Sequence, residues 1–184
     1  PLMGMIDDAF MDVPEEVLVS VMRTHQKYLA LRNKSGQLAP RFITIANIET
    51  ADNGAKIIAG NERVLRSRLS DARFFWDEDR KTDLSARKPE LDKVTFHAKL
   101  GTVSDKTDRI EKLVAYLADF ESGFSFEDLS QNASSEVTNQ AAALCKADLV
   151  TGMVYEFPEL QGIMGGYYAA LQLGDDKVGN AIRD

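Results

Sequence analysis

The hydrophobic pattern of the chain changes its period near residue 60. Before that point the clearest signal is β: a strand pattern at residues 28–32, a turn at 33–36 and a β-branched return strand at 42–48 predict a hairpin with a four-residue loop. After that point apolar residues recur every three or four positions, which is the spacing of one helix face. A chain with both patterns has to fold as a small β-containing part followed by a helical part, so we predict the α+β class.

Two further patterns complete the first part. Residues 3–11 form a short apolar stretch that predicts a strand. Pro14 followed by two glutamates is typical of the first turn of a helix, because proline fits there and acidic side chains favour the positive end of the helix dipole. The predicted buried side of that helix carries Val17, Leu18, Val21 and Met22.

The helical pattern begins at Asn61. Its apolar stripe, spaced for one helix face, consists of Leu65, Leu69, Ala72 and Trp76. After Pro89, residues 90–97 resume a helix-like pattern, and Ser104 is the predicted N-cap of another helix. The predicted core stripe of that helix consists of Ile110, Leu113, Val114 and Leu117.

The last third of the chain contains a polar, loop-like stretch at 121–135 and two more helical patterns at 136–155 and 158–171. We therefore expect three parts. We expect residues 1–58 to form a small mixed α/β part with the hairpin, residues 59–100 to form bridging helices, and residues 101–184 to form a truncated helical domain.

The distribution of charge limits where a polyanion could bind. The net charge of −7 excludes a chain that binds nucleic acid over its whole surface. Residues 1–100 carry 16 Lys and Arg against 15 Asp and Glu, whereas residues 101–184 carry 6 against 14. Contact with phosphates should therefore be local, and the first half of the chain is the better place for it.

Composition also bears on compartment. No apolar run approaches the roughly 20 residues that span a bilayer, so no membrane partner is expected. The start of the chain has no signal-peptide pattern, and the single cysteine, Cys145, fits a reducing compartment, so we expect a cytoplasmic protein. Asp184 ends the chain within a helical pattern that has no cap, so we expect the sequence to be a piece of a longer protein.

Four arginines on the long predicted helix are the main candidate binding residues. At 100° per residue, Arg63, Arg66 and Arg73 lie on one flank of the apolar stripe and Arg68 lies on the other. Guanidinium groups bind phosphates bidentately, and a buried stripe beside them would hold them in place, which suits contacts to an RNA backbone. The alternative is pairing within the fold. The candidate acidic partners are Glu62, Asp71, Asp77 and Asp79.

A second candidate lies at residues 144–149, where the position after an apolar helix resembles the His-Asp doublet of HD-type metal phosphohydrolases. Those enzymes need histidine and aspartate side by side, but here Lys146 and Ala147 precede Asp148. The two histidines of the chain, His25 and His97, lie far away in sequence. We predict no metal site.

Other chemistry-bearing residues are interpreted as structural. His25, His97 and Cys145 have no partner at the spacing of a nucleophile and its base. The glycines at 162, 165 and 166 do not match a phosphate-binding loop and favour close helix packing. Tyr167 and Tyr168 could stack on a base, with core filling as the alternative.

Several collinear segments resemble the beta subunit of bacterial-type glycyl-tRNA synthetase. The first are THQKY at 24–28, LAPRFITIANI at 38–48 and GNERVLR at 60–66, which continues to FFWDEDRK at 74–81. KLGT at 99–102, DKTDRI at 105–110, KADL at 146–149 and EFPELQGIMG at 156–165 follow in the same order. Leu29, where the family commonly has an aromatic residue, and Gly166 depart from its pattern. Together the segments cover about residues 10–180.

The resemblance implies a place in a two-subunit enzyme. In this family the alpha subunit holds the aminoacylation site and uses ATP, Mg²⁺ and glycine, whereas the longer beta subunit binds tRNA through several modules. One of these modules is a degenerate HD-like helical domain, which implies that residues 101–184 belong to it and that Lys146 and Asp148 occupy the degenerate HD position. The expected function is to support binding and positioning of tRNA(Gly) for ATP-dependent aminoacylation by the alpha subunit.

The resemblance also favours particular residues. The candidate tRNA-binding residues are Arg63, Arg66, Arg68 and Arg73, with Lys106 and Arg109 as weaker ones. No catalytic residue and no cofactor are expected within this chain, which should be inactive by itself. The alternatives are a module that docks the alpha subunit without touching RNA, and an HD-type metal phosphohydrolase.

Overall fold

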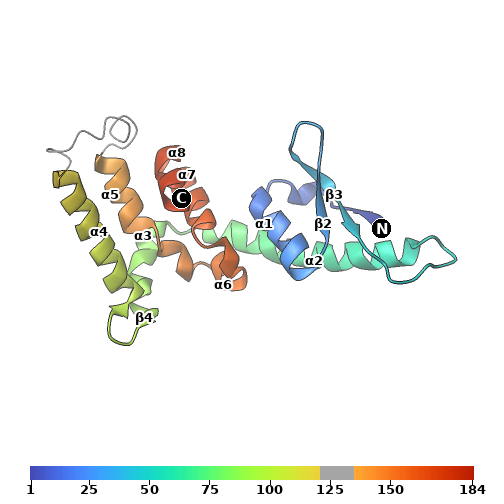
Figure 1. The fold of residues 1–184 in the computed structure, drawn as a ribbon, viewed down its shortest axis with the longest axis horizontal. Helices are drawn as coiled ribbons and strands as arrows, with labels where there is room; N and C mark the ends of the chain where they lie inside the picture. The colour runs from blue at the N-terminus through green and yellow to red at the C-terminus, as the bar shows by residue number, and fades with distance from the viewer. Residues whose placement is uncertain (121–134) are drawn as a thin grey trace. The chain divides into compact units, whose positions relative to one another are not determined.

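The computed structural model describes residues 1–120 and 135–184, which form two compact units, Pro1–Asp77 and Glu78–Asp184 (Figure 1). The first unit contains a three-stranded sheet and the second is mostly helical, so the predicted α+β class is confirmed. The division into parts at residues 58 and 100 stays a prediction, because compactness alone does not mark the domains of a longer protein. Among the described residues, no helix is long and apolar enough to cross a membrane.

The sheet of the first unit is antiparallel in the order β1-β3-β2, with β1 at Leu2–Met5, β2 at Leu29–Arg32 and β3 at Leu38–Thr44. The predicted hairpin is confirmed, but its return strand lies four residues earlier than predicted. Asn33 sets this register: its amide donates to the carbonyl of Gln37 (2.9 Å), and its side chain accepts from the amides of Ser35 and Gln37. Ile45 and Ile48, predicted to be in the strand, are exposed.

The predicted strand over residues 3–11 is wrong beyond Met5. Asp7 accepts a hydrogen bond from the amide of Ala9 (3.1 Å) and caps the short helix η1 (Asp8–Phe10), which ends the extended conformation. The helix predicted at Pro14 is confirmed as α1 (Glu15–Ser20), and it continues as the π-helical turn η2 (Val21–His25). The four apolar residues predicted for its buried side are all 1% exposed or less.

The core of the first unit lies between the sheet and the long helix α2 (Ala55–Asp79). Phe42 of β3 is fully buried and stacks on Tyr28 at 4.6 Å. The predicted stripe of α2 is confirmed, since Leu65, Leu69 and Ala72 are at most 1% exposed. The helix begins six residues earlier than predicted, because the turn before it supplies caps. Gly54 donates to Thr50 Oγ1 (2.8 Å) and Lys56 donates to Asp52 Oδ2 (3.1 Å).

The second unit is built from short elements and a few longer helices (Figure 1). In chain order its elements are α3 (Leu84–Arg87), η3 (Lys88–Lys93), β4 (Thr95–His97), β5 (Gly101–Thr102), α4 (Val103–Phe120), α5 (Ser135–Leu144), η5 (Ala147–Val150), α6 (Gly152–Glu156), η6 (Pro158–Leu160), α7 (Ile163–Leu173) and α8 (Asp176–Arg183).

Three helical predictions in this unit are wrong. Residues 90–97 form a 3-10 helix and a strand rather than an α-helix, because β4 pairs antiparallel with β5 and Gly101, at φ +87°, makes the turn. Residues 136–155 form three elements, since Thr151 starts a new helix as its N-cap. The cap of α4 is Thr102 rather than Ser104. Asp105 accepts from the amide of Thr102 (2.8 Å) and donates its own amide to Thr102 Oγ1 (3.2 Å), which is a capping box.

The core stripe predicted for α4 is only partly buried. Ile110 and Val114 are half-buried, whereas Leu113 and Leu117 are 56% and 52% exposed. The buried side of the helix runs through Val103 and Thr107 instead. The loop predicted at 121–135 lies almost wholly outside the described residues.

Helices α7 and α8 cross at two glycines, which confirms the packing interpretation of the glycine-rich segment. A Cβ placed on Gly166 would lie 2.7 Å from the carbonyl oxygen of Gly179, and a Cβ on Gly179 would lie 2.6 Å from that of Gly166. Both distances are shorter than any real contact of this kind, so the backbones touch directly. Tyr168 and Ala169 of α7 and Val178 of α8 are buried beside the crossing.

We expect Gly166→Ala to lower the free energy of unfolding by about 1–3 kcal/mol, because its methyl group must push the two backbones apart. Gly60→Ala is the matched control, since a Cβ there meets no atom within 4 Å and the position lies inside α2. That control should raise stability by about 0.5–1 kcal/mol. The measurement is urea unfolding followed by circular dichroism, and equal stability of the two variants would contradict the proposed backbone contact.

Candidate functional site

The four candidate arginines on α2 divide into two groups. Arg63, Arg66 and Arg68 are exposed, and among residues 1–120 and 135–184 no ion pair is made by their guanidinium groups. Arg73 is held within the first unit: it donates to the carbonyl of Ala9 and to Asp12 Oδ2 (3.2 Å), and its Nε lies 3.8 Å from Asp77 Oδ2. Internal pairing, the alternative interpretation, therefore describes Arg73 and not the other three.

Two of the four acidic residues considered as partners of these arginines have other roles. Glu62 accepts a hydrogen bond from the amide of Met5 (2.8 Å), which attaches α2 to the edge strand β1. Asp79 is buried in the second unit. The exposed guanidinium groups consequently keep their charge available to a ligand.

Small residues surround two of the exposed arginines. We name Arg63, Arg66, Ser67 and Ser70 the arginine face, since all four are exposed on the side of α2 away from its buried stripe. Ser70 Oγ donates to the carbonyl of Arg66 (2.8 Å), so it does not extend outward as a competing hydrogen-bonding group. A phosphate backbone could approach this part of the helix without meeting a bulky side chain.

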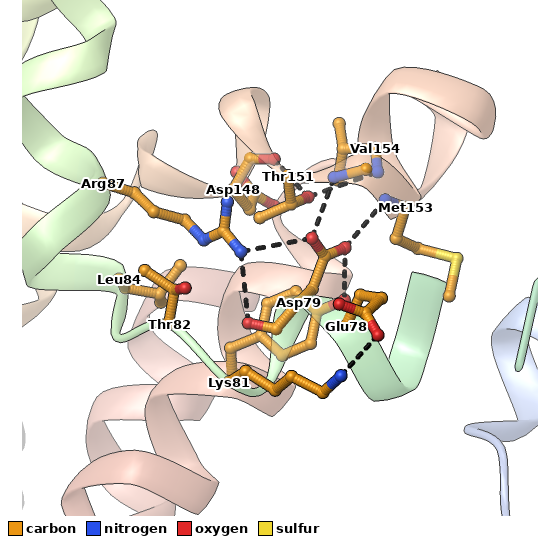
Figure 2. A network of polar contacts seen from close by, with 12 residues as sticks. Glu78, Asp79, Lys81, Thr82, Leu84, Arg87, Asp148, Thr151, Met153 and Val154 are labelled. Carbon is orange, nitrogen blue, oxygen red and sulfur yellow. Dashed lines mark hydrogen bonds and ion pairs between the residues drawn. The ribbon is translucent and has the colours of Figure 1, made fainter. Parts of the chain in front are cut away.

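Asp79 is the centre of a polar network in the second unit (Figure 2). Asp79 is 4% exposed, and its carboxylate accepts four hydrogen bonds. The donors are the amides of Gly152 (2.9 Å) and Met153 (2.8 Å), the hydroxyl of Tyr168 (3.2 Å) and Nη2 of Arg87 (3.3 Å). Arg87 Nη2 also donates to the backbone carbonyl of Asp79 (3.3 Å), which secures the end of α2.

Asp79 and Thr151 together cap helix α6. The first amides of a helix have no partner within it. Here Asp79 accepts from Gly152 and Met153, and Thr151 Oγ1 accepts from Val154 (3.3 Å), so three successive amides are satisfied. Burial, with the Asp79 charge beside it, raises the pKa of Tyr168 far above its ordinary value, so its hydroxyl stays a donor.

Asp148 is a second buried carboxyl group. It is fully buried, and its Oδ2 accepts from the amides of Gly162 (2.6 Å) and Gly165 (3.0 Å). Its Oδ1 is buried and has no hydrogen-bond partner among residues 1–120 and 135–184. Burial raises the pKa of Asp148, and the two amides and the Lys146 charge act against that rise. Asp148 thus fixes the turn before α7, and within the described parts of the chain no three His, Cys, Asp or Glu side chains come together as a metal site.

The remaining candidate residues are dispersed. His97 Nδ1 accepts from the amide of Lys99 (3.1 Å), and Cys145 is partly buried, which raises the pKa of its thiol. Tyr168 is a core residue, and Tyr167 packs against the guanidinium group of Arg183 at 5.4 Å. Lys106 and Arg109 lie together in the first turns of α4, next to the β4–β5 hairpin.

Sequence reasoning missed the roles of Asp79, Arg87 and Thr151. The sequence pattern predicts Asp79 only as a possible partner of the α2 arginines, and it gives no role to Arg87. The available signal was Thr151 followed by Gly152, which is typical of a helix start. It lay within a longer stretch of helical periodicity and so gave no separate prediction.

We expect Asp79→Ala to lower the free energy of unfolding by about 3–5 kcal/mol, because it leaves Arg87 without its buried counter-charge and two amides without an acceptor. Glu78→Ala is the matched control: Glu78 is exposed and pairs with Lys81, and such a surface pair contributes about 0–1 kcal/mol. The two variants are compared by denaturant unfolding. Similar losses in both would show that Asp79 does not hold the unit together.

Asp148 should make stability depend on pH. Its pKa in the folded chain is raised above the ordinary 3.8, so its contribution is complete below that value and is lost as the pH rises through the folded-state pKa. Asp148→Asn stays neutral throughout and lacks this loss. We therefore expect the stability of the natural chain relative to the variant to fall from acid to neutral pH. A difference that is constant in unfolding experiments across that range would contradict the raised pKa.

Comparison with known proteins identifies the family. The model of the glycyl-tRNA synthetase beta subunit family matches residues 1–184. Over the whole chain, the glycine–tRNA ligase beta subunits of Phenylobacterium zucineum and Rhodospirillum centenum are 53% and 51% identical, and that of Geotalea uraniireducens is 50% identical over 98% of it. The chain spans about a quarter of the length of these relatives, namely 26%, 25% and 25%. It belongs to the glycyl-tRNA synthetase beta subunit family.

Proposed function

We propose that this chain is the part of a glycine–tRNA ligase beta subunit that binds the backbone of tRNA(Gly) through the arginine face of α2. The observation that carries the proposal is the exposure of Arg63 and Arg66, whose guanidinium groups have no ion-pair partner among residues 1–120 and 135–184, in a chain whose net charge is −7. An unpaired guanidinium group can form two parallel hydrogen bonds to one phosphate. Arg68, exposed on the other flank of the buried stripe, is a further candidate.

The contribution of this chain to the reaction is positional. Contacts to phosphates fix the orientation of a nucleic acid and do not read its sequence. Because the opposite side of α2 is packed in the core, its arginines are held at fixed positions, and a bound tRNA would be held with them. The alpha subunit would supply the aminoacylation site and use ATP and Mg²⁺. The proposal includes residues 101–184 as an HD-like helical domain without a metal, in a cytoplasmic enzyme.

Arg73 has a smaller part in the proposal. Its guanidinium group is already shared among Ala9, Asp12 and Asp77, and its side chain is 37% exposed. It contributes positive charge near the arginine face, but a bidentate grip on a phosphate would require breaking those contacts.

A second candidate function is docking of a protein partner such as the alpha subunit. It is favoured by two apolar side chains on the exposed sides of α2, Val64 at 47% and Phe74 at 59% exposure. Exposed apolar residues of this size are common at protein interfaces. The two functions are distinguished by whether the arginine variants weaken tRNA binding or the association with alpha.

In the full-length beta subunit assembled with alpha, we expect Arg63→Ala and Arg66→Ala each to weaken tRNA(Gly) binding and to reduce the slope of log affinity against log salt by about 1. Arg41→Ala is the matched control, because Arg41 is exposed and belongs to β3 rather than to α2. Filter binding across a salt series measures the slope.

Slopes that equal that of the control would refute the RNA contact. If the same variants instead weakened the association of beta with alpha, the docking function would replace it.

A further inference from the structure

The hairpin formed by β4 and β5, with the start of α4, carries a second group of surface residues that differs from the arginine face in chemistry; four of the five are exposed and Lys106 is half-buried. We name Phe96, Lys99 and Leu100 of the hairpin, with Lys106 and Arg109 of α4, the hairpin tip. In Figure 1 this hairpin protrudes past the N-terminal end of α4. Phe96 is 42% exposed and Leu100 is 52% exposed, so two large apolar side chains meet solvent at its end.

Positive charge surrounds the exposed ring. Lys106 Nζ lies 4.3 Å from the centroid of the Phe96 ring, over its face. Residues 93–109 carry four Lys and Arg against two Asp, within a second unit that is acidic overall. One of the two acids, Asp105, accepts hydrogen bonds from the amide and hydroxyl of Thr102, so its charge is partly balanced by donors of the capping box. The tip is thus a local basic surface.

The backbone of the tip is fixed by several hydrogen bonds. Arg109 Nη1 donates to the carbonyl of Leu100 (3.0 Å), and the amide of Leu100 donates to the carbonyl of His97 (3.0 Å). The amide of Val103 donates to the carbonyl of Val94 (2.8 Å), which closes the base of the hairpin. The backbone that carries the exposed ring is therefore held in place before any ligand arrives, which lowers the entropy cost of binding.

We propose that the hairpin tip binds an unpaired stretch of RNA, with a base stacked on Phe96 and its flanking phosphates contacted by Lys99, Lys106 and Arg109. An aromatic ring beside lysine and arginine is the arrangement by which proteins bind single-stranded nucleic acid, since every base has a face that can stack. This inference rests on the proposed RNA binding of the chain and adds a contact that requires an unpaired base.

The charge of the tip favours RNA over a protein partner. An apolar protein interface has few charged groups at its centre, whereas here the Phe96 ring lies under one lysine and beside other cations. The acidic surroundings of the second unit would also repel RNA elsewhere, so a phosphate backbone that reaches this unit should meet the tip.

The test uses the full-length beta subunit with alpha and three probes: tRNA(Gly), a single-stranded oligouridylate, and a blunt RNA duplex with the same number of phosphates. We expect Phe96→Leu, which keeps an apolar side chain but removes the ring, to weaken oligouridylate binding about 5- to 150-fold without changing the salt slope. Phe96→Tyr should preserve binding, and duplex binding should stay unchanged. Lys99→Ala should lower the salt slope by about 1.

Phe74→Leu is the matched control, because Phe74 is a similarly exposed ring on α2, outside the tip. Fluorescence anisotropy measures the affinities, and circular dichroism checks that each variant is folded. If Phe96→Leu weakens oligouridylate binding no more than Phe74→Leu does, the inference is wrong. So does a loss confined to assembly with alpha, which would assign the tip to a protein contact.

The arginine-face variants, measured with the same probes, separate the two proposals. If only the hairpin-tip proposal is wrong, Arg63→Ala and Arg66→Ala will still weaken binding of the duplex. If only the arginine-face proposal is wrong, those two variants will not change duplex binding, but Phe96→Leu will still weaken binding of the oligouridylate.

Discussion

The second unit depends on one buried carboxylate at the end of a long helix. Asp79 joins the last turn of α2 to the first turn of α6, to α3 through Arg87 and to α7 through Tyr168. Two of these elements are short, since α3 and α6 contain only four and five residues. Helices of that length have little stability of their own, so their ends must be satisfied by the rest of the fold. Asp79 does this for the first turn of α6, and through Arg87 and Tyr168 it also holds α3 and α7.

Asp148 works by the same principle at a different place. Two amides at the start of α7 share one of its oxygens, and the helix then crosses α8 at glycines that bring the backbones into contact. One oxygen of the Asp148 carboxyl group is therefore committed to the backbone of its own chain.

Much of the fold could be predicted because local patterns and burial agree. The stripe of α2 and the buried side of α1 followed from apolar spacing alone, since each packs one continuous face into a core. Predictions failed where a side chain overruled the pattern: Asp7 ended a strand, Thr151 divided a helix, and β4 paired with β5 across a glycine turn. The role of Asp79 could not be predicted, because three of its four hydrogen-bond partners lie more than 70 residues away. For the arginines, residue spacing predicted on which side of the helix each one lies. It could not show which guanidinium group already binds acceptors within the fold.

The uneven distribution of acidic and basic residues along the chain affects which ligands can bind. Residues 101–184 carry fourteen acids against six bases, yet the basic hairpin tip includes two residues of this range. An acidic surface repels polyanions over most of its area and lets them bind only at the basic hairpin tip. Electrostatic repulsion would keep most cellular RNA from binding to this unit, so repulsion would contribute to selectivity as much as attraction does.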